Sequence, residues 1–272
     1  MSNSFFFNFD ESSHIIEDIE IKKNDDEDTQ KPLCVLNFDY DAPLRAPLTD
    51  SRLVIPGIYE GGGTIWEASL FLLSYLRERP ENFQGAKNIA DLGCGAAILA
   101  REALRNKQLC QLLLTDLNAD VLCNVASPIL RQELSESNTS SFSSSFHPNI
   151  FLVAGSWSSL IHAIQTQSCL EVHMLSESGR ADLVLSSETL YRPSHLPSFC
   201  ILLFELLHPT HGVALLATKR FYYGAELGGG TSAFLAAANA HNGLEATVVQ
   251  TKDVGSAMIL DIIRVVRRER KT

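Results

Sequence analysis

The chain has 272 residues, of which 45% are hydrophobic, and a formal net charge of −10. This size suits one large domain or a domain with tails, and the negative charge argues against direct binding of nucleic acid. No run of about 18 apolar residues is present, so we expect no membrane-spanning segment. The six cysteines show no CxxC spacing and no nearby histidine cluster, which predicts reduced thiols in an intracellular protein and no metal site.

The first 50 residues form the least foldable part of the sequence. The stretch EDIEIKKNDDEDTQK is too charged to offset its ordering entropy by burial. We therefore expect an acidic, disordered tail over residues 1–50 and one folded domain over residues 51–272.

From Thr64 onward, apolar spacing predicts alternating helices and strands. The first helix is expected in residues 64–79, with Thr64 as N-cap and Glu67 completing a capping box. Further helices are expected in residues 96–106, 118–130 (closing near Pro128), 194–209 and 231–242. Strands are expected in residues 88–95, 109–116, 149–157, 181–188, 211–220, 244–251 and 256–268.

The strands are almost continuously apolar, which indicates a mostly parallel sheet covered by helices on both faces. No helix fits between the last two strands, so we expect them to pair as an antiparallel hairpin. The predicted fold is therefore Rossmann-like, with seven strands.

Ligands of such sheets bind beyond the carboxyl ends of the strands. The first strand of the predicted sheet ends in DLGCGAA, where Gly93 and Gly95 allow a tight turn and close ligand approach. Ile98 stands where a dinucleotide fingerprint needs a third glycine, which disfavours a nicotinamide dehydrogenase. Asp116 ends the second strand and can bind ribose hydroxyls, or it can cap the next helix, where Asn118 is the better N-cap. The combination favours S-adenosylmethionine as the cofactor.

The third strand ends in AGSW. Gly155, Ser156 and Trp157 lie where an adenine would need a flat face and a backbone partner. A tryptophan at this place can equally cover the core, and the sequence leaves both interpretations open.

A group of motifs narrows the interpretation further. The sequence contains IPGIYEGGGTIWEASLFLLSYL (55–76), DLGCG, TDLNADVL, GSW, LSSETLYRP and FYYGAELGGG (221–230). Together they resemble the eukaryotic protein-histidine N-methyltransferases of the histidine protein methyltransferase 1 family, which are class I methyltransferases with a seven-stranded sheet. The chain departs from the family where Ile129 follows Pro128, since the family usually has a Pro-Asn pair there.

The resemblance implies a set of cofactor-binding positions. They are Ile65, Trp66, Glu67, Ala68, Ser69, Gly93, Thr115, Asp116, Leu117, Gly155, Ser156, Trp157 and Ser187. It also implies an activity, the methylation of a histidine at the tele nitrogen in a large-subunit ribosomal protein, by a monomer located in the cytoplasm and the nucleus. The alternatives are a lysine or small-molecule methyltransferase of the same fold and a cofactor-binding chaperone for a ribosomal protein.

Methyl transfer to an imidazole needs little acid–base help. Because the pKa of free histidine is about 6.5, most of the imidazole is neutral at pH 7, whereas a lysine needs roughly 4–5 kcal/mol to lose its proton. The enzyme must instead orient the ring by accepting its far N–H. Glu188 is our first candidate for this acceptor and Tyr191 the second, although Glu188 could be a first-turn acid of a helix and Tyr191 a packing residue.

Overall fold

The computed structural model describes residues 15–18, 33–36, 38, 61–139, 147–166, 180–223 and 228–268. Residues 55–60 and 224–227, which belong to two of the family-like motifs, lie outside this part of the chain. Within the described part, no helix combines the length and the apolar character needed to cross a membrane.

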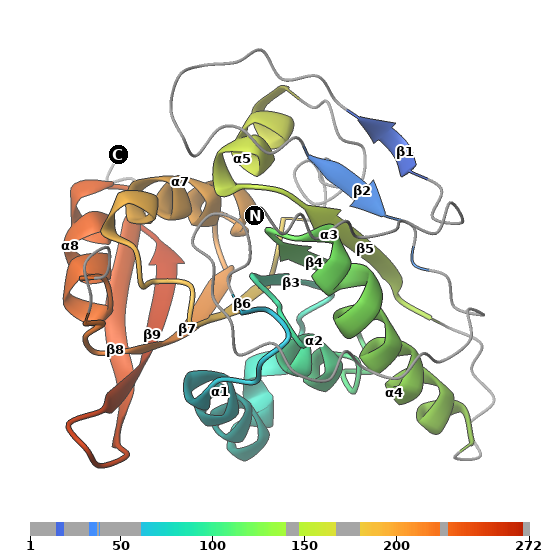
Figure 1. The fold of residues 1–272 in the computed structure, drawn as a ribbon, viewed down its shortest axis with the longest axis horizontal. Coiled ribbons are helices and arrows are strands. Elements are labelled where there is room, and N and C mark those ends of the chain that lie inside the picture. Colours follow the sequence, from blue (N-terminus) through green and yellow to red (C-terminus); the bar gives the residue numbers. More distant parts are fainter. Residues whose placement is uncertain are drawn as a thin grey trace, which may run out of the picture.

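A single twisted sheet forms the centre of the fold (Figure 1). Its strands are β1 (Ile15–Asp18), β2 (Cys34–Leu36), β3 (Asn88–Leu92), β4 (Gln111–Asp116), β5 (Asn149–Ala154), β6 (Leu183–Ser187), β7 (Val213–Lys219), β8 (Leu244–Asp253) and β9 (Ile259–Arg267). They lie in the order β1-β2-β5-β4-β3-β6-β7-β9-β8. Strands β3 to β7 are parallel, and β9 pairs antiparallel with both β7 and β8, so the predicted parallel sheet and its final hairpin are confirmed.

The helices pack on both faces of this sheet. They are α1 (Glu67–Glu78), η2 (Pro80–Phe83), α2 (Ile98–Ala103), α3 (Ala119–Val121), η3 (Leu122–Ala126), α4 (Ser127–Thr139), α5 (Trp157–Thr166), η4 (Pro193–His195), α7 (Leu196–Leu206) and α8 (Thr231–Ala240). Helices α1, α2 and α4 cover one face, whereas α5, α7 and α8 cover the other (Figure 1).

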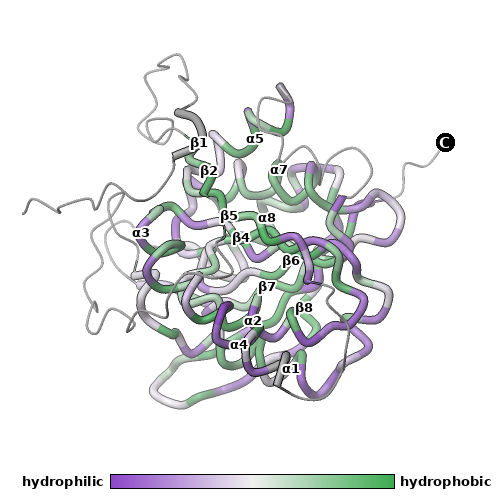
Figure 2. Tube along the Cα trace, turned by 90° about the vertical axis from the view of Figure 1, so that its right-hand side faces the viewer, coloured by the Kyte–Doolittle hydropathy of each residue, from purple (hydrophilic) through white to green (hydrophobic). Residues whose placement is uncertain are grey.

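Two hydrophobic cores result, one between the sheet and each helical layer. Strands β3, β4 and β6 are buried almost throughout because both of their faces are covered, which explains their continuous apolar sequence. The hydrophobic colouring of Figure 2 is concentrated along these central strands, with hydrophilic segments toward the outside.

Two strands from residues 1–50 extend the predicted seven-stranded sheet. Strand β2 pairs antiparallel with β5, and β1 pairs antiparallel with β2. Leu33, just before β2, is 1% exposed and belongs to the core under α5 and α7, while Leu36 belongs to the opposite core. The segment for which we expected disorder therefore supplies both strands and core side chains.

Two predicted helix boundaries are wrong. Thr64 is not the N-cap of α1, because that helix begins at Glu67 with Trp66 in the cap position and no side-chain cap bond. Glu67 is thus the first helical residue, where it cannot complete a capping box. The helix predicted over residues 118–130 does not close near Pro128, because α4 continues to Thr139. In a regular helix the ring of Pro128 would clash with the backbone carbonyl four residues earlier. That carbonyl belongs to η3, whose wider π-helical turn precedes α4.

Candidate functional site

The strand order reverses between β3 and β6, which makes their carboxyl ends the expected ligand site. The ladder places Leu92 of β3 beside both Thr115 of β4 and Ser186 of β6. On β4, Asp116 pairs with Ala154 of β5. The predicted residues at the ends of four separate strands are therefore brought together along one edge of the sheet.

The turn after β3 depends on its two glycines. Gly93 and Gly95 both have positive φ, +66° and +52°. A Cβ on Gly93 would lie 2.6 Å from the Cγ2 of Thr189, and one on Gly95 would lie 3.0 Å from the carbonyl oxygen of Gly62. Hence the turn is closely packed by two other segments, and side chains at either position would be both strained and crowded.

Asp116 organises the loops around this turn. Its Oδ2 accepts the N–H of Gly95 at 3.1 Å and its Oδ1 accepts the N–H of Asn118 at 3.1 Å. Asn118 does hold the N-cap position of α3, but its side chain makes no cap bond. A carboxylate has about four acceptor positions, so one side chain can accept hydrogen bonds from several donors at once.

Asp91 is a functional candidate to which sequence reasoning gave no role. Its Oδ2 accepts the N–H of Ala100 at 3.0 Å, whereas its Oδ1 is buried with no hydrogen-bond partner. Burial, helped by the nearby charge of Asp116, raises the pKa of Asp91 to about 7. Burial and these same two carboxylates raise the pKa of the Cys94 thiol. The charge of Asp116 and the ionised fraction of Asp91 therefore make the region beneath the glycine turn negative, which suits a positively charged ligand.

The first turn of α1 lies against the end of β6. The hydroxyls of Ser69 and Ser187 are 2.6 Å apart and share a hydrogen bond. Trp66 donates from its indole N–H to the carbonyl of Gly61 at 3.3 Å. Of the other predicted positions, Ala68 is buried, whereas Ile65 and Glu67 are exposed, so their side chains point away from the packed contact with β6.

The end of β5 serves the core and the site together. Gly155 donates its N–H to the carbonyl of Asp116 at 2.9 Å. The Oγ of Ser156 accepts the N–H of Ser159 at 3.2 Å, in the first turn of α5. The Trp157 ring packs on Phe199 with a centroid separation of 5.4 Å, and its edge also reaches 3.7 Å from where a Cβ of Gly93 would be. Trp157 therefore packs on the core beside the glycine turn, and its contact with an adenine stays a prediction.

Thr115 and Leu117 flank Asp116. The Oγ1 of Thr115 accepts the N–H of Gly93 at 3.4 Å, and its carbonyl accepts the N–H of Cys94 at 2.9 Å. Leu117 is half-buried just beyond the strand. Thr115 thus holds the glycine turn in place from the neighbouring strand.

Glu188 follows β6 in a left-handed conformation, with φ of +56°. It is not a first-turn acid of a helix, because η4 begins only at Pro193. Its side chain is 8% exposed, its Oε2 accepts the hydroxyl of Tyr222, and its Oε1 lies 3.8 Å from the Nζ of Lys219. Burial raises the pKa of Glu188, and the Tyr222 hydroxyl and the Lys219 charge oppose this rise.

Tyr191 is half-buried beside this cluster. Its ring meets that of Tyr222 edge-on, with centroids 6.1 Å apart. Its carbonyl accepts the N–H of Gly229 at 3.0 Å, and the carbonyl of Leu190 accepts the N–H of Gly230 at 2.7 Å. The glycine-rich segment after β7 is therefore fastened to the residues that follow β6.

Lys219 and Tyr222 are further residues that sequence reasoning did not assign individually. They lie about 30 residues after Glu188, and only the pairing of β6 with β7 brings them to it. The available signal was their place directly after a predicted strand, where parallel sheets gather functional side chains.

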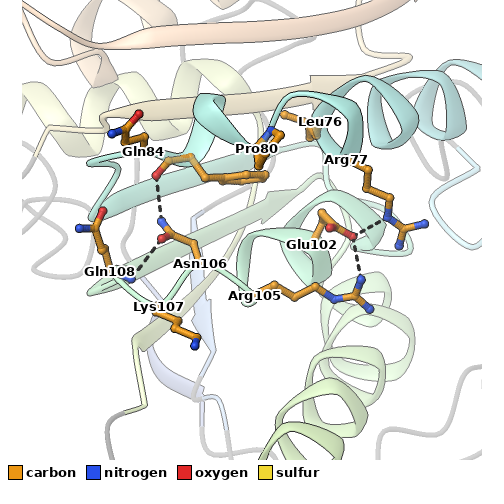
Figure 3. A pocket seen from close by; sticks show the side chains of 10 residues that line it. Leu76, Arg77, Pro80, Gln84, Glu102, Arg105, Asn106, Lys107 and Gln108 are labelled. Atoms are coloured by element: carbon orange, nitrogen blue, oxygen red, sulfur yellow. Dashed lines mark hydrogen bonds and ion pairs between the residues drawn. The ribbon is translucent and has the colours of Figure 1, made fainter.

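A pocket of about 400 Å³ lies at the opposite, amino-terminal edge of β3 and β4 (Figure 3). It is lined by Leu76, Arg77, Pro80, Phe83, Gln84, Glu102, Arg105, Asn106, Lys107 and Gln108. Glu102 pairs with Arg77 at 2.8 Å and Arg105 at 3.4 Å, and Asn106 donates to the carbonyl of Ala86 at 2.6 Å. Since these polar groups bind each other, the pocket does not compete with the strand-end site.

Comparisons with known proteins give a consistent result. No protein-family model matches the chain. It is 30% identical to a histidine protein methyltransferase 1 homolog of Bos taurus over 232 residues, which are 80% of this chain and 59% of that protein. It is also 30% identical to histidine protein methyltransferase 1 of Schizosaccharomyces pombe (76% of this chain, 66% of that protein) and 24% identical to a homolog of Dictyostelium discoideum (81% and 62%). The chain thus spans less than two thirds of the length of these relatives.

A solved structure supports the fold. The N-methyltransferase NodS of Bradyrhizobium japonicum, in complex with S-adenosyl-L-homocysteine, superposes with a TM-score of 0.51 at 14% identity, over 75% of this chain and 89% of that one. The order of the strands and this structural match indicate the same fold. The chain has the class I methyltransferase fold, and over about three quarters of its length its sequence is similar to histidine protein methyltransferase 1 proteins.

Proposed function

We propose that this chain is an S-adenosylmethionine-dependent methyltransferase that modifies the tele nitrogen of a histidine in a large-subunit ribosomal protein. The proposal rests on the family relationship and on one structural observation. The carboxylate of Glu188 is buried, and Thr189, the next residue, reaches to 2.6 Å from where a Cβ of Gly93 would lie. The proposed cofactor site is thus next to Glu188, the group proposed to orient the histidine that receives the methyl group.

The residues at the strand ends fit S-adenosylmethionine, which supplies an electrophilic methyl group on a positively charged sulfur. Asp116 would accept hydrogen bonds from the ribose, and Trp157 would offer a ring face to the adenine. The segment from Ile65 to Ser69 would close over the cofactor from the side of α1. The buried, unpartnered oxygen of Asp91 makes the site favourable for a cationic ligand.

The acceptor side requires orientation more than basicity. A histidine imidazole is mostly neutral at pH 7, so a group that accepts its far N–H is sufficient to present the other nitrogen. We assign this role first to Glu188 and second to Tyr191. We further propose that the enzyme acts as a monomer in the cytoplasm and the nucleus, where ribosomal proteins are made and assembled.

The decisive experiment combines the purified chain, S-adenosylmethionine and ribosomal proteins from cells that lack this chain. We expect mass spectrometry to find one methyl group added to one histidine of one large-subunit protein. Methylation of a lysine instead would favour the lysine methyltransferase alternative. Binding of a ribosomal protein without any methyl transfer would favour a chaperone.

Glu188→Gln tests the orienting role. We expect the rate of histidine methylation to fall at least about tenfold, because a charge-assisted hydrogen bond to the imidazole is lost. The affinity for S-adenosylmethionine, measured by calorimetry, should stay within about twofold. Asp116→Ala is the counterpart, since it should weaken cofactor binding by about tenfold or more. Unchanged turnover in Glu188→Gln would remove the role.

A further inference from the structure

The two carboxylate oxygens of Glu188 have different surroundings. Oε2 accepts the hydroxyl of Tyr222, whereas Oε1 is buried and makes no hydrogen bond of normal geometry to any residue that the structure describes, although the Ala68 amide is near enough to lower the pKa of Glu188. The nearest cation to Oε1 is the Nζ of Lys219, at 3.8 Å, which is beyond hydrogen-bond distance. A buried carboxylate oxygen without a donor is costly, so its position calls for a ligand that can donate.

The hydroxyl of Tyr222 is itself held in one orientation. Its oxygen accepts the backbone N–H of Lys219 at 3.4 Å and the hydroxyl of Thr218 at 3.2 Å. A phenol has a single proton, and with donors already directed at its oxygen that proton points toward Glu188. Burial, together with the charge of Glu188, raises the pKa of Tyr222, which keeps this proton in place.

We propose that Tyr222, assisted by Lys219, is a positioning residue that fixes the carboxylate of Glu188 so that its Oε1 accepts the N–H of the substrate imidazole. This inference rests on the proposed histidine methylation and assigns residues to it beyond Glu188 and Tyr191. Lys219 is itself confined, because its Nζ lies over the rings of Trp66 and Tyr222 at 5.4 and 5.6 Å from their centroids.

The electrostatics of the cluster give this role a measurable signature. Burial raises the pKa of Glu188, and the negative charge of Glu67 adds to the rise. The Tyr222 hydroxyl, the Lys219 charge and the Ala68 backbone amide lower it. Removing the Tyr222 hydroxyl therefore raises the pKa of Glu188 further, so a smaller fraction of Glu188 is ionised at low pH.

Tyr222→Phe is the direct test, with Tyr75→Phe as its matched control. Tyr75 is a buried tyrosine of α1 that lies toward the opposite end of the helix from Ser69, with Arg79 over its ring. We expect Tyr222→Phe to lower the turnover of a histidine peptide about tenfold at pH 7, with cofactor affinity unchanged. The ratio of wild-type to variant turnover should fall as the pH rises, because the variant's Glu188 then regains its charge.

Taking this ratio at each pH cancels the titration of the substrate histidine, which both enzymes share. A ratio that is constant across pH, or equal to that of Tyr75→Phe, would overturn the positioning role while leaving histidine methylation intact. A wild-type chain that methylates no histidine would instead overturn the proposed function, and this inference with it. Lys219→Met should change the ratio in the same direction and provides a second variant should Tyr222→Phe fold poorly.

Discussion

At the scale of single residues, the candidate site is built from carboxylates in unequal surroundings. Asp116 receives two backbone N–H groups, whereas Asp91 receives one and has an oxygen without a partner. Glu188 is also buried, but a tyrosine hydroxyl and a lysine face it. Such separated environments are how one fold assigns different roles to chemically similar groups.

The buried state of Asp91 predicts a pH dependence of stability. Its pKa is about 7 in the folded protein and about 3.9 in an unfolded chain. Between these values only the folded state holds the proton, so the free energy of unfolding falls as the pH rises, by about 1.4 kcal/mol per unit. Asp91→Asn should remove this pH dependence, which amounts to about 2 kcal/mol between pH 5 and 7 because the slope lessens near the folded pKa.

Urea unfolding of the cofactor-free protein at several pH values measures this effect. The difference between wild type and Asp91→Asn isolates Asp91, because the other titrating groups are common to both. Asp120→Asn, at an exposed carboxyl in the first turn of α3, serves as the control and should follow the wild type. A difference that does not change with pH would show that Asp91 is not protonated at low pH in the folded state.

At the scale of elements, the predictability of each part depends on the range of the interactions that stabilise it. Strands β3 and β4 are apolar runs that end in a glycine turn and an acid, so their type and direction follow from local sequence. Strand β2 has only three residues and no readable period, and its stability comes from pairing with β5 more than 100 residues later. Tertiary pairing of this kind has no local signature.

In the candidate site, too, features set by local sequence could be predicted and features set by long-range contacts could not. The positions of Gly93 and Asp116 at strand ends could be predicted, because the strand pattern determines which residues reach that edge. The bond between Tyr222 and Glu188 could not be predicted, because it depends on how the segment after β7 folds back. The start of α1 at Glu67, and not with Thr64 as its cap, likewise reflects the contact of Ser69 with β6.

The glycine-rich segment before α8 makes a contact that a side chain would break. A Cβ on Gly229 would lie 2.0 Å from the carbonyl oxygen of Leu190, a backbone atom that cannot move aside. We expect Gly229→Ala to cost about 1–3 kcal/mol in stability and to reduce turnover at least about tenfold. Cofactor affinity, measured by calorimetry, should change little because Gly93 and Asp116 lie on other elements.

Gly228→Ala is the matched control for this prediction. Unlike Gly229, Gly228 has a positive φ, +142°, and the nearest atom to its Cβ would be the Cγ of Pro193 at 3.7 Å. Gly228→Ala therefore adds a methyl group and backbone strain to the same segment without the collision. Equal effects of the two substitutions on turnover would show that the contact with Leu190 does not account for the loss.

At the scale of the whole molecule, the sheet joins three regions of the sequence around one edge. The central parallel strands carry the glycine turn and Asp116, and the β8–β9 hairpin completes one side of the sheet. The two N-terminal strands complete the other side, next to β5 and its AGSW end. Because β5 precedes Trp157 directly, the N-terminal strands support the region where the adenine is proposed to bind.

This arrangement predicts that the N-terminal segment is part of the folded unit. Leu33 is 1% exposed and packs in the core beneath α5 and α7, so Leu33→Ala should lower the free energy of unfolding by about 2–5 kcal/mol. Leu70→Ala removes the same atoms from a side chain that is 53% exposed on α1 and should cost less than about 0.5 kcal/mol. Urea unfolding at one pH compares the two variants. If residues near β2 were only a loose tail, the two substitutions would have the same small effect, and the sheet would end at β5.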